Sequence, residues 1–286
     1  MITINDLQVS YKDVKALDID RKIEINAHDR VGVIGSNGAG KTTFVKACLG
    51  ILPYEGTIAT EVAPSQMSVH MQFNEYVDTM SVKNVMETIL NTDVDKNPKL
   101  QELINFFNFN DHLKKHYKNL SGGLKQRFTL ILVLMQDAPI TFFDEVTTGL
   151  DFSTRQSLID KILEWYDHKE SCIIFITHYY EELERLTNKL MILDAGKLID
   201  FGDTKELFRK YCGHSVVTFN ANQIEHTLID SYKKIIAPEG MLALSCKTPE
   251  EEMGLVQLLV EKNVSFKRSN YDIEILSMNA IGGNKK

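Results

Sequence analysis

Residues 35–42 are the feature of this sequence that most restricts its fold. They read Gly-Ser-Asn-Gly-Ala-Gly-Lys-Thr and match the pattern G-x-x-x-x-G-K-[ST], between a short apolar strand predicted over 30–34 and a helix predicted from Lys41. Glycines in such a turn let backbone N–H groups point at phosphate oxygens, and the start of the helix adds partial positive charge. The pattern therefore predicts a phosphate-binding loop within an α/β fold.

The end of this loop has the side chains that a nucleotide with a magnesium ion requires. Lys41 can reach the β- and γ-phosphates, and the Thr42 hydroxyl can ligate Mg²⁺. The residues predicted to bind the nucleotide are Gly35, Ser36, Asn37, Gly38, Ala39, Gly40, Lys41, Thr42 and Thr43.

Two acidic residues end a second apolar run. Asp144 and Glu145 follow Ile-Thr-Phe-Phe at 140–143, which predicts a buried strand. A carboxylate at the carboxyl end of a strand beside the phosphate loop is placed to hold Mg²⁺, which predicts this role for Asp144. Glu145, one residue further, can point to the attacking water and act as general base or orient it.

A third motif, Leu-Ser-Gly-Gly-Leu-Lys-Gln-Arg at 120–127, predicts another anion site at the start of a helix. Ser121 is a good N-cap, and Gly122 and Gly123 leave backbone N–H groups accessible. A second phosphate-binding helix start is redundant within one subunit, but it has a purpose if it covers the γ-phosphate held by another subunit. With this motif the chain resembles the ATP-binding cassette (ABC) ATPases, whose signature sequence these residues match.

The resemblance covers residues 1–210 and implies further site residues. Tyr11 lies where the family stacks an aromatic ring on adenine, and Gln72 lies where it contacts Mg²⁺ and water and begins a loop that touches the membrane subunit. Residues 146–151 resemble the loop that contacts the opposite subunit. His178 resembles the histidine that hydrogen-bonds the γ-phosphate. The implied cofactors are ATP and Mg²⁺, and the implied catalytic residues are Lys41, Gln72, Glu145 and His178.

Three positions depart from the common family pattern. Leu124 replaces a glutamine of the signature, and Val146 and Phe152 each replace a proline. These changes remove one side-chain contact and are expected to loosen the loop between subunits. No catalytic atom is lost, so we expect a site that hydrolyses ATP.

The alternation of strands and helices predicts an α/β P-loop NTPase with an accessory domain. We expect an ABC nucleotide-binding domain over 1–212, with a mostly parallel sheet, an antiparallel β subdomain and a helical subdomain at about 73–136. A small C-terminal α/β domain, with strands and helices of its own, is expected over 213–286. Its expected elements are strands at 215–219 and 241–246, helices at 223–235 and 249–262, and strand or hairpin segments at 264–277.

Composition excludes several functions. The chain of 286 residues has 32 basic and 39 acidic residues and a net charge of −7, so we expect no nucleic-acid partner. Its apolar runs are shorter than the roughly 20 residues of a membrane span, and its N-terminus does not resemble a signal peptide. The four cysteines are far apart, as expected for reduced, buried residues rather than a zinc or redox site.

These observations favour the ATPase subunit of a membrane transporter. We expect a separate transmembrane permease, a second nucleotide-binding subunit in head-to-tail arrangement, and a location on the cytoplasmic face of the membrane. The domain order and the sequence Leu-Ser-Gly-Gly-Leu resemble ABC-2-type exporters of Gram-positive bacteria, which handle drugs, lantibiotics or amphipathic peptides. The alternatives are a non-transport ABC ATPase of the translation or DNA-repair type, and a regulatory nucleotide-binding module.

Overall fold

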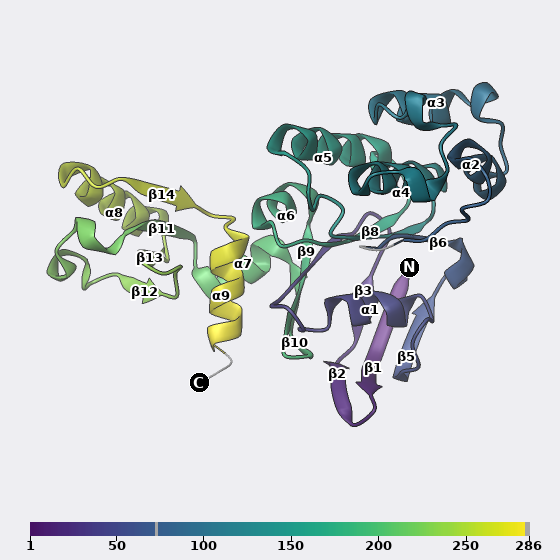
Figure 1. Cartoon of the computed structure of the whole chain (residues 1–286). Helices are drawn as coiled ribbons and strands as arrows, with labels where there is room; N and C mark the ends of the chain where they lie inside the picture. The colour runs from purple at the N-terminus through teal and green to yellow at the C-terminus, as the bar shows by residue number, and fades with distance from the viewer. Residues whose placement is uncertain (72–73, 284–286) are drawn as a thin grey trace.

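The largest element of the fold is a curved mixed sheet, to which ten strands contribute within the part of the chain that the structure describes (Figure 1). The structure is a computed structural model and describes residues 1–71 and 74–283. The strand order is β3-β1-β2-β10-β9-β4-β8-β7-β6, with β5 paired to β1. The strands are β1 (Ile2–Tyr11), β2 (Val14–Ile19), β3 (Ile23–Ile25), β4 (Arg30–Ile34), β5 (Glu55–Thr60), β6 (Met67–His70), β7 (Ile140–Asp144), β8 (Cys172–Ile176), β9 (Lys189–Asp194) and β10 (Lys197–Asp203).

Parallel pairing gathers the predicted site residues at one edge of this sheet. Strands β6, β7, β8, β4 and β9 run parallel to one another, whereas β9 pairs antiparallel with β10, and β1 pairs antiparallel with β2, β3 and β5. The carboxyl ends of β4, β7 and β8 therefore lie together, and they lead into the phosphate loop, Glu145 and His178. Ligands of open α/β sheets bind at this edge.

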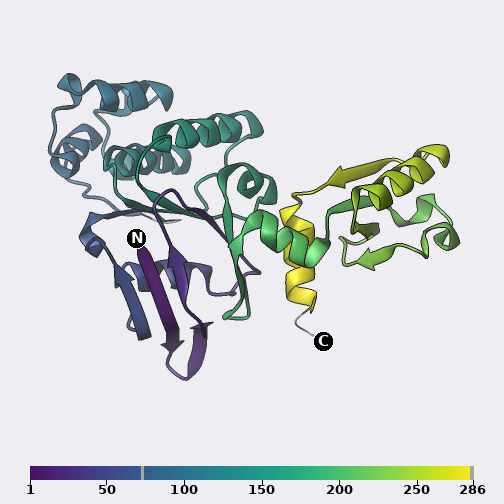
Figure 2. The ribbon, with the colours of Figure 1, turned by 180° about the vertical axis from the view of Figure 1, so that it is seen from behind.

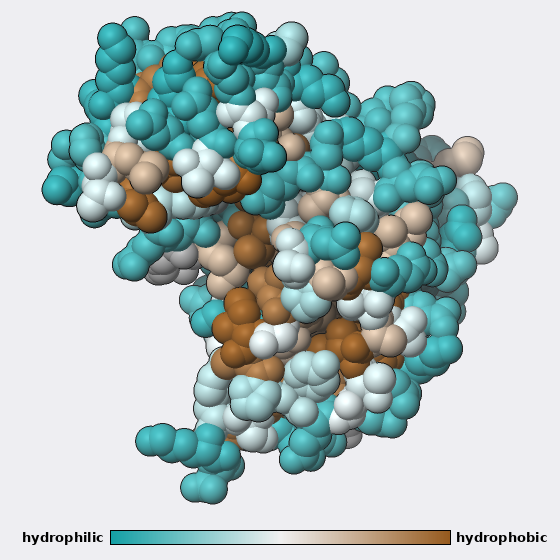
Figure 3. Space-filling model, turned by 90° about the vertical axis from the view of Figure 1, so that its right-hand side faces the viewer, coloured by the Kyte–Doolittle hydropathy of each residue, from teal (hydrophilic) through white to brown (hydrophobic). Residues whose placement is uncertain are grey.

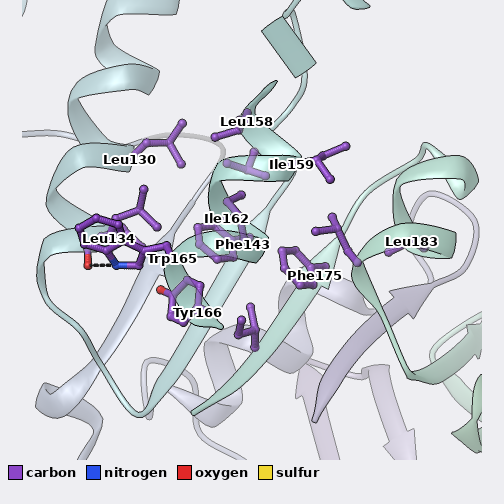
Figure 4. Packing of buried hydrophobic residues seen from close by; sticks show 14 of the residues in the cluster. Leu130, Leu134, Phe143, Leu158, Ile159, Ile162, Trp165, Tyr166, Phe175 and Leu183 are labelled. Atoms are coloured by element: carbon purple, nitrogen blue, oxygen red, sulfur yellow. Dashed lines mark hydrogen bonds between the residues drawn. The ribbon is translucent and has the colours of Figure 1, made fainter. Parts of the chain in front are cut away.

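Helices α5 (Phe152–Tyr166) and α6 (Tyr180–Leu186) cover one face of the sheet and form a continuous core with it. The rings of Phe143 and Phe175 stack with centroids 5.4 Å apart beneath α5 (Figure 4). The indole N–H of Trp165 donates to the Leu134 carbonyl at 2.8 Å. This aromatic packing fixes strands β7 and β8, and with them the residues that follow each strand.

A helical layer lies between β6 and β7 in the sequence. It contains α2 (Val82–Leu90), α3 (Pro98–Phe106) and α4 (Gly122–Met135). Ser81, Asn97 and Ser121 cap these helices through side-chain oxygens that accept from backbone N–H groups. Within residues 1–71 and 74–283, no helix is both long and apolar enough to cross a membrane.

The C-terminal residues form a second, four-stranded antiparallel sheet in the order β12-β13-β11-β14. The helix Pro249–Glu261 packs on one face of this sheet. Its side chains Leu255 and Leu259 form a separate apolar cluster with residues of the strands. The elements are β11 (Ser215–Asn220), β12 (Lys233–Ile235), β13 (Met241–Cys246), α8 (Pro249–Glu261) and β14 (Phe266–Ser269).

Two expectations for this region are wrong. Residues 223–235 are not a helix: short 3-10 turns lead into β12, because this segment pairs with Ala243–Ser245 of β13. Residues 264–277 are not all extended: after β14 the chain forms α9 (Ile273–Gly283). The sequence of α9 has no polar face, because the helix is buried on more than one side. An apolar run with β-branched residues is typical of a strand, which explains the wrong prediction.

Helix α9 returns from the second sheet to the first. It packs against α6, β9 and α7 (Thr204–Cys212), and Figures 1 and 2 both show α7 and α9 between the two sheets. The Tyr271 hydroxyl donates to the Thr187 carbonyl at 2.9 Å, and the Ile273 N–H donates to the Glu184 carboxylate at 3.2 Å. The buried side chains of α9 therefore belong to the core that also contains Phe143 and Phe175. The strand β10 and the helix α7 were not expected from the sequence.

Candidate functional site

The phosphate loop joins β4 to α1 (Lys41–Cys48) in a conformation that depends on glycine. Gly40 precedes the helix with φ of 100°, and a Cβ atom there would lie 2.8 Å from the Ala16 carbonyl oxygen. At Gly35 a Cβ atom would lie 2.3 Å from the Leu193 carbonyl oxygen. Side chains at these positions would be strained or would clash, so the loop can approach the neighbouring backbone only with glycine.

Lys41 is folded into this loop. Its ammonium group donates to the carbonyl oxygens of Gly35 and Ser36 at 2.7 and 3.0 Å. Burial lowers the pKa of Lys41, and the negative charges of Glu145 and Asp144 act in the opposite direction. A largely buried cation at the start of a helix, in a glycine-rich loop, fits a phosphate group.

Thr42 and Asp144 meet across the sheet edge. The Thr42 hydroxyl donates to a carboxylate oxygen of Asp144 at 3.1 Å. Asp144 is 4% exposed, and burial raises its pKa. Oxygen ligands of this kind are those that Mg²⁺ prefers, and a cation here would compensate the buried carboxylate. The two residues therefore fit a magnesium site.

Glu145 has an unusual backbone conformation. Its φ is 53°, in the left-handed region, and its N–H donates to the Ile176 carbonyl at 2.8 Å. This turn brings one carboxylate oxygen within 3.0 Å of Nε2 of His178. Non-glycine residues in the left-handed region are strained and concentrate at functional sites. The strained backbone of Glu145 places its carboxylate beside the imidazole of His178.

These groups line a single cleft of about 340 Å³. This is the lower part of the range typical of small-molecule sites. The cleft is lined by Tyr11, Ala16, Asn37, Gly38, Ala39, Gly40, Lys41, Thr42, Thr43, Asp144, Glu145, Ile176 and His178. Tyr11 is 44% exposed, so one side of its ring is available to a ligand. Gln72, the remaining predicted ligand, lies outside the described residues.

Ser121, Gly122 and Gly123 do not line this cleft, but the two glycines line a neighbouring cavity of about 560 Å³ that Glu145 also lines. The Ser121 hydroxyl accepts from the Leu124 N–H at 3.4 Å and caps α4. Added Cβ atoms at Gly122 or Gly123 would meet no atom within 4 Å, so the start of this helix is open. Among the described residues that line the phosphate cleft, none comes from this motif. This arrangement is compatible with the expectation that the motif serves a second subunit.

Sequence reasoning missed the residues that hold the surrounding loops. The Gln126 side chain on α4 donates to the carbonyl of Val146, directly after Glu145. Val146 itself is buried. Glu182 on α6 accepts from Thr147 and Thr177, one in the loop after Glu145 and one just before His178. The signal in the sequence is a threonine two residues after Glu145 and another directly before His178.

A phosphate loop, a metal-ligand pair and a carboxylate–imidazole pair in one cleft define the class as a P-loop nucleotide hydrolase. Residues 20–148 match the family model described as ABC transporter. The chain has the ABC ATPase fold, and the match over residues 20–148 makes this part of it similar to the ATPase domain of ABC transporters. The chain is thus similar in this region and in its fold to the ATP-binding subunits of ABC transporters, and such subunits are ATPases.

Curated relatives of this chain include both import and export subunits. It is 29% identical to the molybdate/tungstate import ATP-binding protein WtpC of Methanocaldococcus jannaschii, over 96% of this chain and 92% of that protein. It is 26% identical to the methionine import ATP-binding protein MetN of Clostridium tetani, over 73% and 71%. It is 27% identical to the Nod factor export ATP-binding protein I of Cupriavidus metallidurans, over 79% and 78%.

Solved structures show the same fold. An ATP-binding subunit of an ABC transporter superposes with a TM-score of 0.68 at 21% identity, over 74% of this chain and 93% of that one. A bacterial Atm1-family ABC exporter with ATP bound superposes with a TM-score of 0.63 at 21% identity, over 73% of this chain and 40% of that one.

Proposed function

We propose that this chain binds ATP with Mg²⁺ in the cleft of the phosphate loop and hydrolyses it to drive transport through a separate membrane permease. One observation carries this proposal: the Glu145–His178 pair, with its 3.0 Å separation, lines the same cleft as Lys41 and the Thr42–Asp144 pair. A site that only stored nucleotide would not need a strained carboxylate beside an imidazole.

Each residue has a distinct role in this proposal. Backbone N–H groups of residues 35–43 and the ammonium of Lys41 hold the β- and γ-phosphates and compensate their charge. Thr42, Asp144 and Gln72 would hold Mg²⁺, which neutralises charge on the phosphate oxygens when it is bound. Glu145 accepts a proton from the water that attacks the γ-phosphorus.

His178 acts beside Glu145. Its Nε2, which contacts the Glu145 carboxylate in this structure, can donate its hydrogen to a γ-phosphate oxygen instead when nucleotide is bound. Tyr11 stacks on the adenine at the rim of the cleft. Ser121, Gly122 and Gly123 of a second, head-to-tail subunit cover the γ-phosphate, because they are open and do not reach the cleft of their own chain.

An apolar groove is the proposed contact with the permease, which would place the chain at the cytoplasmic face of the membrane. The groove is lined by Glu75, Tyr76, Val77, Met80, Val85, Thr88 and Ile89. Val77 is 55% exposed and Ile89 is 42% exposed. The face of the molecule that lies on the side of α2 has hydrophobic surface between hydrophilic areas (Figure 3). Exposed apolar side chains in a groove beside α2 suit a helix of a partner.

We propose export as the direction of transport, on the resemblance of the domain order and of Leu-Ser-Gly-Gly-Leu to ABC-2-type exporters. Import is the second candidate, because the match to the import protein of Methanocaldococcus jannaschii covers 96% of this chain. The partners that co-purify with the tagged chain from native membranes distinguish the two. A permease alone supports export, whereas a permease with a substrate-binding protein supports import. Val77→Asp and Ile89→Asp should release either permease without lowering nucleotide affinity.

The Glu145→Gln variant tests the catalytic part of the proposal. Because the amide cannot accept the proton, we expect ATP affinity to be kept while hydrolysis falls by about 10²-fold or more. Light scattering should then show an ATP-dependent dimer. A Glu145→Gln variant that hydrolyses ATP at the normal rate, or that stays monomeric with Mg²⁺-ATP, would contradict the assigned role.

A further inference from the structure

Glu182 is a buried carboxylate that the hydrolysis mechanism does not use. It lies on α6 and is 3% exposed. One of its oxygens accepts two hydrogen bonds, each 2.9 Å long, from the hydroxyls of Thr147 and Thr177. Thr147 lies two residues after Glu145, and Thr177 directly precedes His178. The two hydroxyls thus come from the two loops that carry the catalytic pair.

The other side of this carboxylate faces a cation. The Arg155 guanidinium lies 3.4 Å from the second oxygen of Glu182, and it stacks on the Tyr179 ring with 3.7 Å between its central carbon and the ring centroid. Thr177 also accepts a hydrogen bond from the Tyr179 N–H at 3.1 Å. Burial raises the pKa of Glu182, whereas the two hydroxyls and Arg155 lower it. The cluster therefore joins α5, α6 and both loops.

A purely structural role would not require a buried carboxylate at this position. A buried carboxylate loses hydration, and an apolar residue of similar volume at the same position is often neutral or stabilising. The hydrogen bonds of the carboxylate could have gone to its own helix, but they go to the residues that flank Glu145 and His178. The His178 side chain is 47% exposed, so packing around its ring restrains it little.

We propose that Glu182 is a positioning residue for ATP hydrolysis: it ties the loop after Glu145 to the loop that carries His178 and so fixes the carboxylate relative to the imidazole. This inference rests on the proposed function of the cleft. Both loops are bound to a single oxygen atom, so the loss of either hydroxyl removes this side-chain tie and leaves the backbone hydrogen bond from Glu145 to Ile176. A displacement of catalytic groups by about 1 Å can reduce the rate by up to about 10².

The two threonines provide the test, because valine has the same shape as threonine and lacks the hydroxyl. In the full-length chain, Thr147→Val and Thr177→Val should each lower kcat for ATP about tenfold, with KM changed less than about twofold. Thr147→Ser and Thr177→Ser keep the hydroxyl and should recover most of the lost rate. Thr187→Val is the matched control: it removes a buried hydroxyl at the end of the same helix that bonds only the Leu183 carbonyl, and kcat should not change.

The double variant Thr147→Val/Thr177→Val separates positioning from general destabilisation. Because both hydroxyls act through one oxygen, we expect the double variant to lose about as much rate as either single variant, not the product of the two losses. Thermal unfolding shows that each protein is folded at the assay temperature. Multiplicative losses, or serine variants as slow as valine variants, would refute the shared tie.

Failure of the positioning role and failure of the proposed function give different results. If Glu145→Gln loses hydrolysis while Thr147→Val and Thr177→Val both keep the wild-type kcat, only the role of Glu182 is overturned. A wild-type rate that Glu145→Gln leaves unchanged overturns the assigned catalytic site, and the positioning role with it.

Discussion

At the scale of the residue, the identity of the catalytic candidates was readable, but their geometry was not. An Asp-Glu pair after an apolar strand is visible in the sequence. The left-handed backbone of Glu145 is not, because it depends on a hydrogen bond to Ile176 on the neighbouring strand. Likewise, no local pattern distinguishes Glu182 from its exposed neighbour Glu181, since its partners are the distant residues Thr147 and Arg155 and Thr177 of the adjacent loop.

The buried carboxylate of Glu182 gives a stability prediction that depends on pH. Its pKa is raised in the folded state, so the folded protein binds this proton more tightly than the unfolded chain does. The resulting stabilisation is fully present below the unfolded pKa and is lost as the pH rises through the folded pKa. The stability of the wild type relative to Glu182→Gln should therefore increase as the pH falls from 7 toward 4.5.

This comparison is made by thermal unfolding of both proteins in parallel at several pH values. The difference between the two melting temperatures removes the contribution of titrating groups that both proteins share. A difference that is constant over this range would mean that Glu182 titrates alike in the folded and unfolded chains.

At the scale of the element, α4 was predicted well because its signals are local. Ser121, two glycines and an apolar run mark its start and length, and the structure has the cap that this pattern implies. The tail was predicted less well. Residues 233–235 form a strand only because β13 offers a partner, and α9 is a helix without a polar face because two parts of the molecule cover it. Local periodicity contains neither fact.

The open start of α4 leads to a prediction about two different subunits. Lys41→Ala should abolish nucleotide binding, because the buried ammonium of the phosphate loop is lost. Ser121→Arg removes a helix cap and should lower the free energy of unfolding by about 1 kcal/mol. It should leave nucleotide binding by the monomer intact but block closure of the dimer. A heterodimer of the two variants has one composite site with both defects and one intact site. It should hydrolyse ATP at a reduced rate, although each variant alone is inactive.

The experiment requires heterodimers purified through two different tags. Activity in the purified heterodimer, with none in either homodimer, supports an arrangement in which Lys41 and Ser121 of opposite subunits serve one ATP. Inactive heterodimers that are confirmed by mass would contradict that arrangement.

At the scale of the whole molecule, the two sheets do not have fully separate cores. The proposed division into residues 1–212 and 213–286 follows the sheets, but α9 crosses it. Its buried residues belong to the cluster that contains Phe143 and Phe175 beneath the catalytic edge, whereas Leu255 of α8 belongs to the separate cluster of the tail. Sequence alternation predicted a folded tail, but it could not show that the last helix returns to the first sheet.

Alanine substitutions of two leucines, one in each core, test whether the two cores contribute separately to stability and nucleotide binding. Leu276 on α9 and Leu255 on α8 are both 0% exposed, so replacement of either by alanine should lower the free energy of unfolding by about 2–5 kcal/mol. Only Leu276→Ala should lower the temperature at which nucleotide binding is lost, because α9 packs on α6, and α6 begins two residues after His178. Leu255→Ala should loosen the tail alone, seen as faster amide exchange in β11 and β13. Equal effects of the two variants on the binding transition would mean that α9 gives no specific support to the catalytic edge.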